Sequence, residues 1–241
     1  MSQDAVKTLH HHRSIRKFLD KEIDADLRQQ LIQSARMASS SNHYHLQCVS
    51  IIRVTDQTMR QQLMEWCSNQ QYVASAPEFW VFCVDFAKHA EIFPQAQLDW
   101  TEVLLIGAVD AGIMAQNVLA SAELLGLGGV YIDSLRNQMA KVGELLQLPK
   151  HTLPLVGMCL GYPNQDPPLK PRLPNEMMFF ENHYQALDKN KLAEFDQLTA
   201  DYYQARSNID NNWSKNVIKA LDKPVRPGVL PYLQQQGFVK K

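Results

Sequence analysis

The feature that most constrains the fold is an apolar stretch, VLLIGAVDAGIMAQNVLASAELLGLGG, at residues 103–129. Its polar residues are too numerous for an uninterrupted membrane span: Asp110, Gln116, Asn117 and Glu123. The pattern therefore predicts that residues 102–125 form a helix of a soluble protein, roughly 35 Å long at 1.5 Å per residue. The glycines at 126, 128 and 129 are expected to end this helix. Because this helix is apolar nearly all round, one sheet cannot cover it. We expect it in the middle of a domain or at the seam of a dimer.

The composition narrows the function classes. A chain of 241 residues, 45% hydrophobic and 20% charged, is typical of a globular protein. A formal net charge of −1 gives no basic excess for nucleic acid, and no lysine-rich helix is present to dock on a membrane. The N-terminal residues include no apolar run typical of a signal peptide. The cysteines form no CxxC pair, so we expect reduced thiols of a cytoplasmic protein at Cys48, Cys67, Cys83 and Cys159.

Hydrophobic periodicity predicts the other elements. Helices are expected at 24–37, 55–74, 134–148, 189–206 and 213–223, and strands at 47–54, 78–85, 129–132 and 153–163. Asp24 is a candidate N-cap of the first of these helices, and Thr55 or Asp56 of the second. Strands and helices mix without regular βαβ alternation, which favours an α+β fold. We expect one domain over residues 1–241, with residues from about 188 to 241 as a C-terminal helical extension.

Several possible site motifs are weak. A zinc site needs converging ligands, and the three adjacent histidines at 10–12 cannot all point inward, so we expect no metal. The serines at 39–41 lack the GxSxG elbow of a hydrolase. The GLGG sequence at 126–129 follows a helix, whereas a dinucleotide-binding loop follows a strand, so these glycines favour a helix stop.

Two segments indicate an anionic ligand. HRSIR, at 12–16, places Arg13, Ser14 and Arg16 together, and arginine binds phosphate through two parallel hydrogen bonds. LKPRLP, at 169–174, holds Lys170 and Arg172 in a proline-stiffened loop. Taken alone, the first could equally be an exposed basic strand and the second a solvated linker.

Together with other segments these two carry a family resemblance. HRSIRKF, SARMASSS, QCVSIIRVTD, EFWVFCVDF, LGLGGVYI, LRN, LPLVGMCLGYP and LKPRLP occur in this order, and the chain resembles the nitroreductase flavoproteins of the major, group A type. The resemblance implies an α+β FMN-binding fold with a mainly antiparallel sheet flanked by helices, in an interlocked homodimer. It implies an enzyme that carries hydride from NADPH through FMN to nitroaromatics, quinones or flavins by a ping-pong mechanism. The alternative is a non-catalytic flavin-binding or sensing protein on the same fold.

The resemblance also implies roles for individual residues. FMN contacts are expected from His12, Arg13, Ser14, Ile15, Arg16, Ser40, Ser41, Gln70, Tyr131, Ile132, Asp133, Ser134, Lys170, Pro171 and Arg172. The segment 131–134 would pass the flavin N5 with its backbone, and no side chain is expected to act as an acid or base. Arg206 is expected to bind the 2′-phosphate of NADPH.

Three places depart from the family pattern. Asp133 and Ser134 stand where the resemblance leads us to expect two glycines. The loop at 42–46 is longer and bulkier than usual, and we expect His43, Tyr44 and His45 to alter the acceptor pocket. The segment after Arg206 lacks the usual basic residues and contains an acid, Asp210. These departures concern the range of acceptors and the degree of preference for NADPH over NADH.

Overall fold

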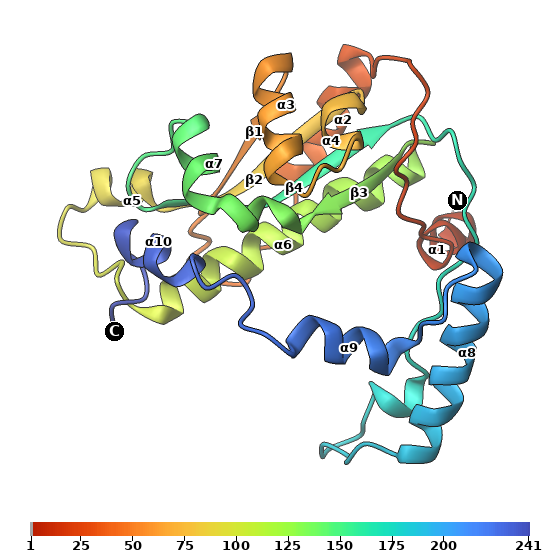
Figure 1. Ribbon diagram of the computed structural model, residues 1–241. Helices are drawn as coiled ribbons and strands as arrows, with labels where there is room; N and C mark the ends of the chain where they lie inside the picture. Colours follow the sequence, from red (N-terminus) through yellow and green to blue (C-terminus); the bar gives the residue numbers. More distant parts are fainter. Residues whose placement is uncertain (1) are drawn as a thin grey trace. The chain divides into compact units, whose positions relative to one another are not determined.

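The computed structural model describes residues 2–241, and a four-stranded antiparallel sheet forms the centre of the unit that contains residues 2–166 and 226–241 (Figure 1). The strands are β1 (Val49–Arg53), β2 (Glu78–Asp85), β3 (Gly128–Ile132) and β4 (Thr152–Gly161), in the spatial order β1-β2-β4-β3. Every neighbouring pair is antiparallel. The predicted α+β class and all four predicted strands are therefore confirmed, with end points that differ by at most a few residues.

The two faces of the sheet carry separate apolar cores. Along β2, Phe79, Val81 and Cys83 face one core, and Trp80 and Phe82 face the other, as the two-residue period of a strand requires. The first core is covered by α3 (Gln57–Trp66), α4 (Tyr72–Ser75), η1 (Asp133–Gln138) and α7 (Met139–Leu145). The second is covered by α2 (Ala25–Arg36) and α6 (Thr101–Leu124), which lie along the opposite face (Figure 1).

Helix ends follow local capping chemistry. Asp24 caps α2 by accepting a hydrogen bond from Leu27 N, as the sequence predicted. Of the two candidates for the N-cap of α3, Thr55 and Asp56, it is Asp56 that accepts from Met59 N. The helix predicted at 55–74 is divided into α3 and α4, because residues 68 and 69 adopt φ values of 61° and 55°. The helix predicted at 134–148 begins as the 3₁₀ segment η1. Short elements that the sequence analysis missed are α1 (Ser2–His10), α5 (Ala87–Ile92), η2 (Asn175–Met177) and α10 (Val229–Gln235).

The chain forms two compact units. The first comprises the residues up to Asp166 and then Arg226–Lys241, so α10 belongs with the sheet. The second, Pro167–Val225, comprises the proline-rich loop, η2, α8 (Lys189–Ser207) and α9 (Trp213–Leu221). In the second unit the rings of Phe195 and Trp213 pack edge to face, 5.8 Å between centroids, and hold α8 against α9.

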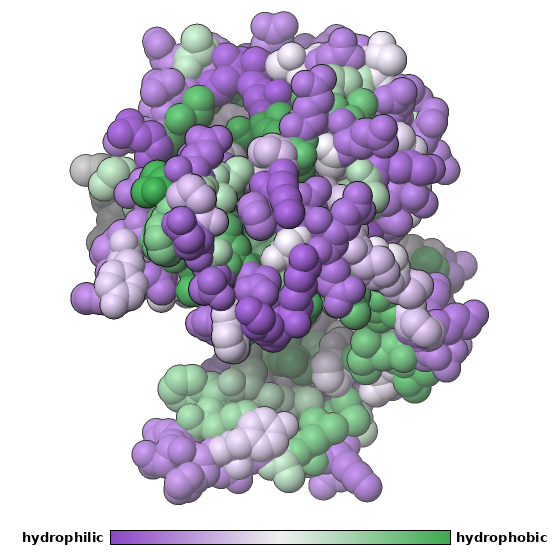
Figure 2. Space-filling model, turned by 90° about the vertical axis from the view of Figure 1, so that its left-hand side faces the viewer, coloured by the Kyte–Doolittle hydropathy of each residue, from purple (hydrophilic) through white to green (hydrophobic). Residues whose placement is uncertain are grey.

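Helix α6 packs against the sheet with one side only. Small residues such as Gly107, Ala111 and Ala115 are buried, whereas Leu105 and Val109 are about half exposed, at 53% and 48%. By length and composition α6 could also cross a membrane, although a third of its most apolar window is buried inside the protein. Apolar surface, green in Figure 2, remains among the polar residues of the molecule. Of the two places expected for this helix, the middle of a domain is therefore not observed within a single chain, and the seam of a dimer stays a prediction.

Candidate functional site

The first predicted segment, residues 12–16, lies against the edge strand β3. Ile15 N donates to Gly129 O at 2.9 Å, and Leu19 N donates to Tyr162 O at 2.9 Å. A side chain at Gly128 would meet Ile15 Cγ1 at 2.5 Å, so only glycine allows this approach. Ile15 is buried at 6% exposure, and only its backbone is left to contact a ligand. This anchoring holds Arg13, Ser14 and Arg16 in place beside the sheet edge.

Arg13 points into a cavity of about 280 Å³ that also contains Glu123 and Asp166. Its guanidinium lies 3.4 Å from the Asp166 carboxylate, and its Nε is buried without a hydrogen-bond partner among the described residues. Beside it, the His12 imidazole pairs with the Glu123 carboxylate at 2.5 Å between Nδ1 and Oε1. The C-terminal turn of α6 thus positions His12 next to an arginine that retains an unused donor.

Arg16, Gln70 and Ser134 lie in one neighbourhood on the α3–α4 side of the sheet. Arg16 is exposed, and its guanidinium lies near the hydroxyl of Tyr72. Burial raises the pKa of Tyr72, and the Arg16 guanidinium offsets part of this shift. Ser134 Oγ donates to Gln70 Oε1 at 3.2 Å. Three separate predicted segments are therefore brought together here.

Tyr131 and Asp133 flank the end of β3. The Tyr131 hydroxyl reaches the opposite face and donates to Gln116 Oε1 on α6 at 3.2 Å, and burial raises the pKa of this phenol. Ile132 is fully buried, so it can offer a ligand only its backbone. The Asp133 carboxylate is not free: Arg226 NH2 donates to its Oδ2 at 2.7 Å.

Ser40 and Ser41 are held elsewhere, by the buried Asp110 of α6. Ser41 N donates to Asp110 Oδ1 at 2.6 Å, and Ser40 Oγ donates to Oδ2 at 3.1 Å. Asp110 and Glu123 are 13 positions apart on the helix, which corresponds to about 20 Å along its axis. Within one chain, the serines are therefore separated from the His12 segment by most of the helix.

The remaining predicted residues lie in the second unit. Lys170 Nζ stands 5.7 Å from the Tyr203 ring centroid, and Lys170 and Pro171 line a cavity of about 370 Å³. Arg172 NH1 donates to Lys170 O at 2.8 Å, which braces the loop. Arg172 itself lines another cavity, of about 160 Å³. Arg206, at the end of α8, is exposed, and its NH1 donates to Tyr202 Oη at 3.0 Å.

Comparison with known proteins decides the family. The model of the nitroreductase family matches residues 9–162, and the model of the nitroreductase family C-terminal domain matches residues 170–241. The chain belongs to the nitroreductase family. It is 48% identical, over 98% of both chains, to the oxygen-insensitive NADPH nitroreductase of Salmonella typhimurium. It is also 48% identical, over 99% of both chains, to the NADPH-flavin oxidoreductase of Vibrio harveyi.

Solved structures of nitroreductase-family members support the same assignment. The Vibrio harveyi NADPH:FMN oxidoreductase complexed with NAD+ superposes with a TM-score of 0.93, covering 99% of this chain and 100% of that one. Nitroreductase A from Vibrio parahaemolyticus, 48% identical, also gives a TM-score of 0.93, covering 98% of each chain. The resemblance inferred from the ordered motifs and the predicted nitroreductase fold are both confirmed.

Four residues that matter to this geometry were not predicted: Tyr72, Asp110, Glu123 and Arg226. Asp110 and Glu123 did leave a signal, since a carboxylate inside an otherwise apolar helix needs a partner in the fold. The partners of Tyr72 and Arg226 are distant in sequence, at Arg16 and Asp133, and no local pattern indicates them.

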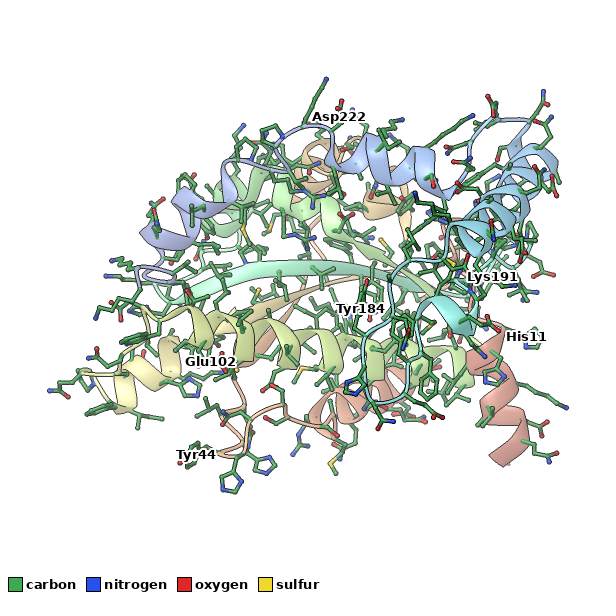
Figure 3. The ribbon with its side chains drawn as sticks, turned by 90° about the horizontal axis from the view of Figure 1, so that it is seen from below. His11, Tyr44, Glu102, Tyr184, Lys191 and Asp222 are labelled. Atoms are coloured by element: carbon green, nitrogen blue, oxygen red, sulfur yellow. The ribbon has the colours of Figure 1, made fainter. Side chains whose placement is uncertain are left out.

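Replacing Asp110 with asparagine is expected to loosen the serine segment, because the carboxylate accepts hydrogen bonds from both Ser40 and Ser41. One charge-assisted hydrogen bond contributes about 1.5–3 kcal/mol. Thermal unfolding with and without added FMN should show a smaller stabilisation by FMN in Asp110→Asn than in the wild type. The exposed variant Glu102→Gln, on the same helix (Figure 3), is the control. An unchanged stabilisation by FMN would contradict a role for Asp110 in placing these serines.

Proposed function

We propose that this chain is an FMN-dependent enzyme that uses NADPH to reduce nitroaromatics, quinones or flavins. The class of enzyme predicted from the sequence, an NADPH nitroreductase or flavin reductase, is confirmed by relatives of nearly equal length at 48% identity. The observation that supports FMN as the cofactor is the anchored HRSIR segment, with an arginine donor that has no hydrogen-bond partner among residues 2–241. Bound FMN would supply the redox chemistry, taking hydride from NADPH and passing it to the acceptor.

The residues present fit an anionic, polar-edged cofactor. Arg13 offers a buried, unpartnered Nε, and Arg16 forms no ion pair among the described residues. An unsatisfied buried donor costs about 1–3 kcal/mol, so a phosphate oxygen at Arg13 would remove that cost. Gln70 and Ser134 offer an amide and a hydroxyl next to the same edge of the sheet. This donor set suits a phosphate and the heteroatoms of a flavin ring.

The side chains and backbone of the protein would bind and orient the cofactor. We assign Arg13, Ser14 and Arg16 to hold the cofactor's polar groups, and the backbone of 131–134 to contact the ring. His12 is held by Glu123 and so keeps its ring orientation. Cations near a ring that becomes negatively charged favour its reduced state. No side chain needs to donate or remove a proton at the reacting carbon.

We propose a homodimer as the functional form. Leu105 and Val109 leave an exposed apolar strip on α6, and exposed strips of this kind mark interfaces. The separation between Ser40 and His12 along α6 supports the same proposal. If each subunit gives its serines to the cofactor of the other, both sets of residues can serve one site.

Light scattering is therefore expected to give twice the monomer mass of 27.5 kDa. Replacing Leu105 and Val109 together with glutamate should shift the protein toward monomer and weaken FMN retention, because charges would be buried in an apolar contact. The matched control is Leu221→Glu, at an exposed leucine of the second unit. A wild-type monomer that retains FMN would contradict the proposal.

Lys170 and Arg172 are proposed to stabilise bound and reduced FMN. Prolines and the Arg172–Lys170 O hydrogen bond hold the loop that carries them. Each charge-assisted hydrogen bond is worth roughly 1.5–3 kcal/mol, so Lys170→Ala or Arg172→Ala should weaken FMN binding by about tenfold or more, or lower the flavin midpoint potential. Fluorescence titration and dye-coupled potentiometry measure the two quantities. Wild-type values in both variants would exclude this role, and Lys189→Ala serves as the control for a lost surface charge.

The remaining assignments rest on the sequence. We propose one nitroreductase domain with a C-terminal extension, located in the cytoplasm. All four cysteines are free and buried, as expected of a reducing compartment, and burial raises the pKa of Cys48 to about 12.

Steady-state kinetics test the proposed function. NADPH oxidation should depend on added nitrofuran or quinone, and varying both substrates should give the parallel double-reciprocal lines of a ping-pong enzyme. A protein that binds FMN but does not oxidise NADPH with any of these acceptors would instead favour the alternative, a flavin-binding or sensing role.

A further inference from the structure

Asp133 is a carboxylate on the turn that follows β3, and Arg226 reaches it from a segment 93 positions later in the chain. We propose that Arg226 is a positioning residue that neutralises Asp133, and that the pair sets how well this turn tolerates negative charge on FMN. This inference rests on the proposed function, which places residues 131–134 against the cofactor. It adds to that site a pair of residues, Asp133 and Arg226, that controls the electrostatic environment of FMN.

The Arg226 guanidinium donates hydrogen bonds to two side chains of the first unit. Its NH2 donates to Asp133 Oδ2 at 2.7 Å, and its Nε donates to Asn137 Oδ1 at 2.9 Å. The guanidinium therefore connects Asp133, the first residue of η1, with Asn137 near its end. Arg136, 3.9 Å from the same carboxylate, is the other cation that faces Asp133 among the described residues. With 24% of its side chain exposed, Arg226 is less solvated than Asp133 at 61%.

The backbone at Arg226 is also set for this contact. Arg226 has a φ of 48°, in the left-handed region that a non-glycine residue rarely adopts. It directly precedes Pro227 and Gly228, at the point where the chain rejoins the first unit before α10. Residues keep such a conformation only where their surroundings determine it. The bonds to Asp133 and Asn137 are interactions that can do so.

The electrostatic consequence follows from the charge that the cofactor gains. Hydride uptake adds one negative charge to a neutral ring, so a bare carboxylate on the neighbouring turn would oppose it. An arginine at 2.7 Å cancels most of that field. With Arg226 in place, the acid at Asp133 would oppose the reduction of bound FMN far less. Removing Arg226 should weaken FMN binding and lower the flavin midpoint potential only while Asp133 keeps its charge.

A double-mutant cycle tests this prediction, with wild type, Arg226→Gln, Asp133→Asn and the double variant. The measurements are the FMN dissociation constant, the midpoint potential of the bound flavin and the thermal midpoint of the apoprotein. Arg226→Gln should weaken FMN binding by about tenfold, because the uncovered Asp133 carboxylate repels the anionic cofactor, and it should make the potential more negative. In the double variant both quantities should match Asp133→Asn within about twofold in affinity.

Lys241→Gln is the matched control, because it also removes the cation of an ion pair, here with Asp99 at 3.1 Å near the start of α6. It should change neither affinity nor potential. If the losses of Arg226→Gln persist in the Asp133→Asn background, Arg226 acts without Asp133 and the inference is overturned. A lowered thermal midpoint with an unchanged potential overturns it as well, since the pair is then structural. Failure of the wild type to bind FMN overturns the proposed function and this inference together.

Discussion

Replacing Arg206 with alanine is expected to raise the KM for NADPH by about 10- to 150-fold and to leave the KM for NADH nearly unchanged. The range corresponds to one charged contact of roughly 1.5–3 kcal/mol, at 1.4 kcal/mol per tenfold. NADH lacks the 2′-phosphate, so an arginine that binds this group contributes little to NADH affinity. Arg206 is exposed at the end of α8, where, in the part of the chain that the structure describes, the Tyr202 hydroxyl is the one group that accepts from its NH1. Its charge is available to a ligand.

The structure sharpens this prediction at Asp210. An acid near the 2′-phosphate would repel it, but Lys215 Nζ lies 2.6 Å from the Asp210 carboxylate and offsets its charge. Lys215→Ala should therefore raise the KM for NADPH as well, by exposing Asp210, and Asp210→Asn should remove that effect. Arg206→Lys is the conservative control and should fall between wild type and alanine. Steady-state kinetics with both nucleotides decide the role: an equal loss for NADPH and NADH would mean that Arg206 does not read the phosphate.

Replacing Glu78 with glutamine is expected to lower the free energy of unfolding by about 3 kcal/mol. This value is the lower end of the range for breaking a buried ion pair, because Arg28 and Arg53 keep part of their side chains in solvent. Glu78 is 2% exposed and accepts from Arg28 Nε at 2.7 Å, Arg53 Nε at 2.6 Å and Trp80 Nε1 at 2.8 Å. It joins β1, β2 and the start of α2. Urea unfolding at neutral pH measures the change, with the exposed Glu65→Gln as the control.

The same residue gives a pH dependence with a defined sign. Burial alone would raise the pKa of Glu78, but hydrogen bonds from Arg53, Trp80 and Arg28 outweigh it and hold the pKa below its usual 4.5. A carboxyl with a depressed folded-state pKa stabilises the fold above the unfolded pKa, and this stability is lost as the pH falls through the folded value. The wild type should therefore lose more stability than Glu78→Gln below about pH 4.5. Parallel acid titrations of the two proteins would contradict this.

The sequence predicted the sheet well because its strands carry strong local signals. β2 is buried along its whole length and rich in aromatic and β-branched residues, and α2 and α3 have aspartate N-caps at their starts. Short elements such as α5 and α10 were missed, since six or seven residues offer too few turns for a clear apolar period. The break between α3 and α4 depends on positive φ at Ser68 and Asn69. Such conformations are not specified by residue type alone.

For the candidate site, the predicted residue types stand out in the sequence, but their partners do not. HRSIR and LKPRLP are recognisable as clusters of cations, whereas the hydrogen bonds between Ser40 and Asp110 or Asp133 and Arg226 join positions 70 and 93 residues apart. The bulky loop at 42–46 illustrates the same limit. Tyr44 is 80% exposed and projects from the first unit (Figure 3). The residues that Tyr44 contacts in an assembly cannot be predicted from the sequence of one chain. Contacts between residues distant in the sequence determine the geometry of the site, and such contacts are known only once the fold is known.

The absorbance spectrum of the FMN-reconstituted protein, recorded without oxygen, tests the central claim most directly. Adding one equivalent of NADPH should bleach the yellow flavin band, and adding a nitrofuran or quinone afterwards should restore it, because the proposed site serves the two substrates in turn. The Arg13→Ala variant should retain less FMN and bleach correspondingly less. A wild-type protein that takes up no FMN, or a bound flavin that NADPH leaves yellow, would contradict the proposed function.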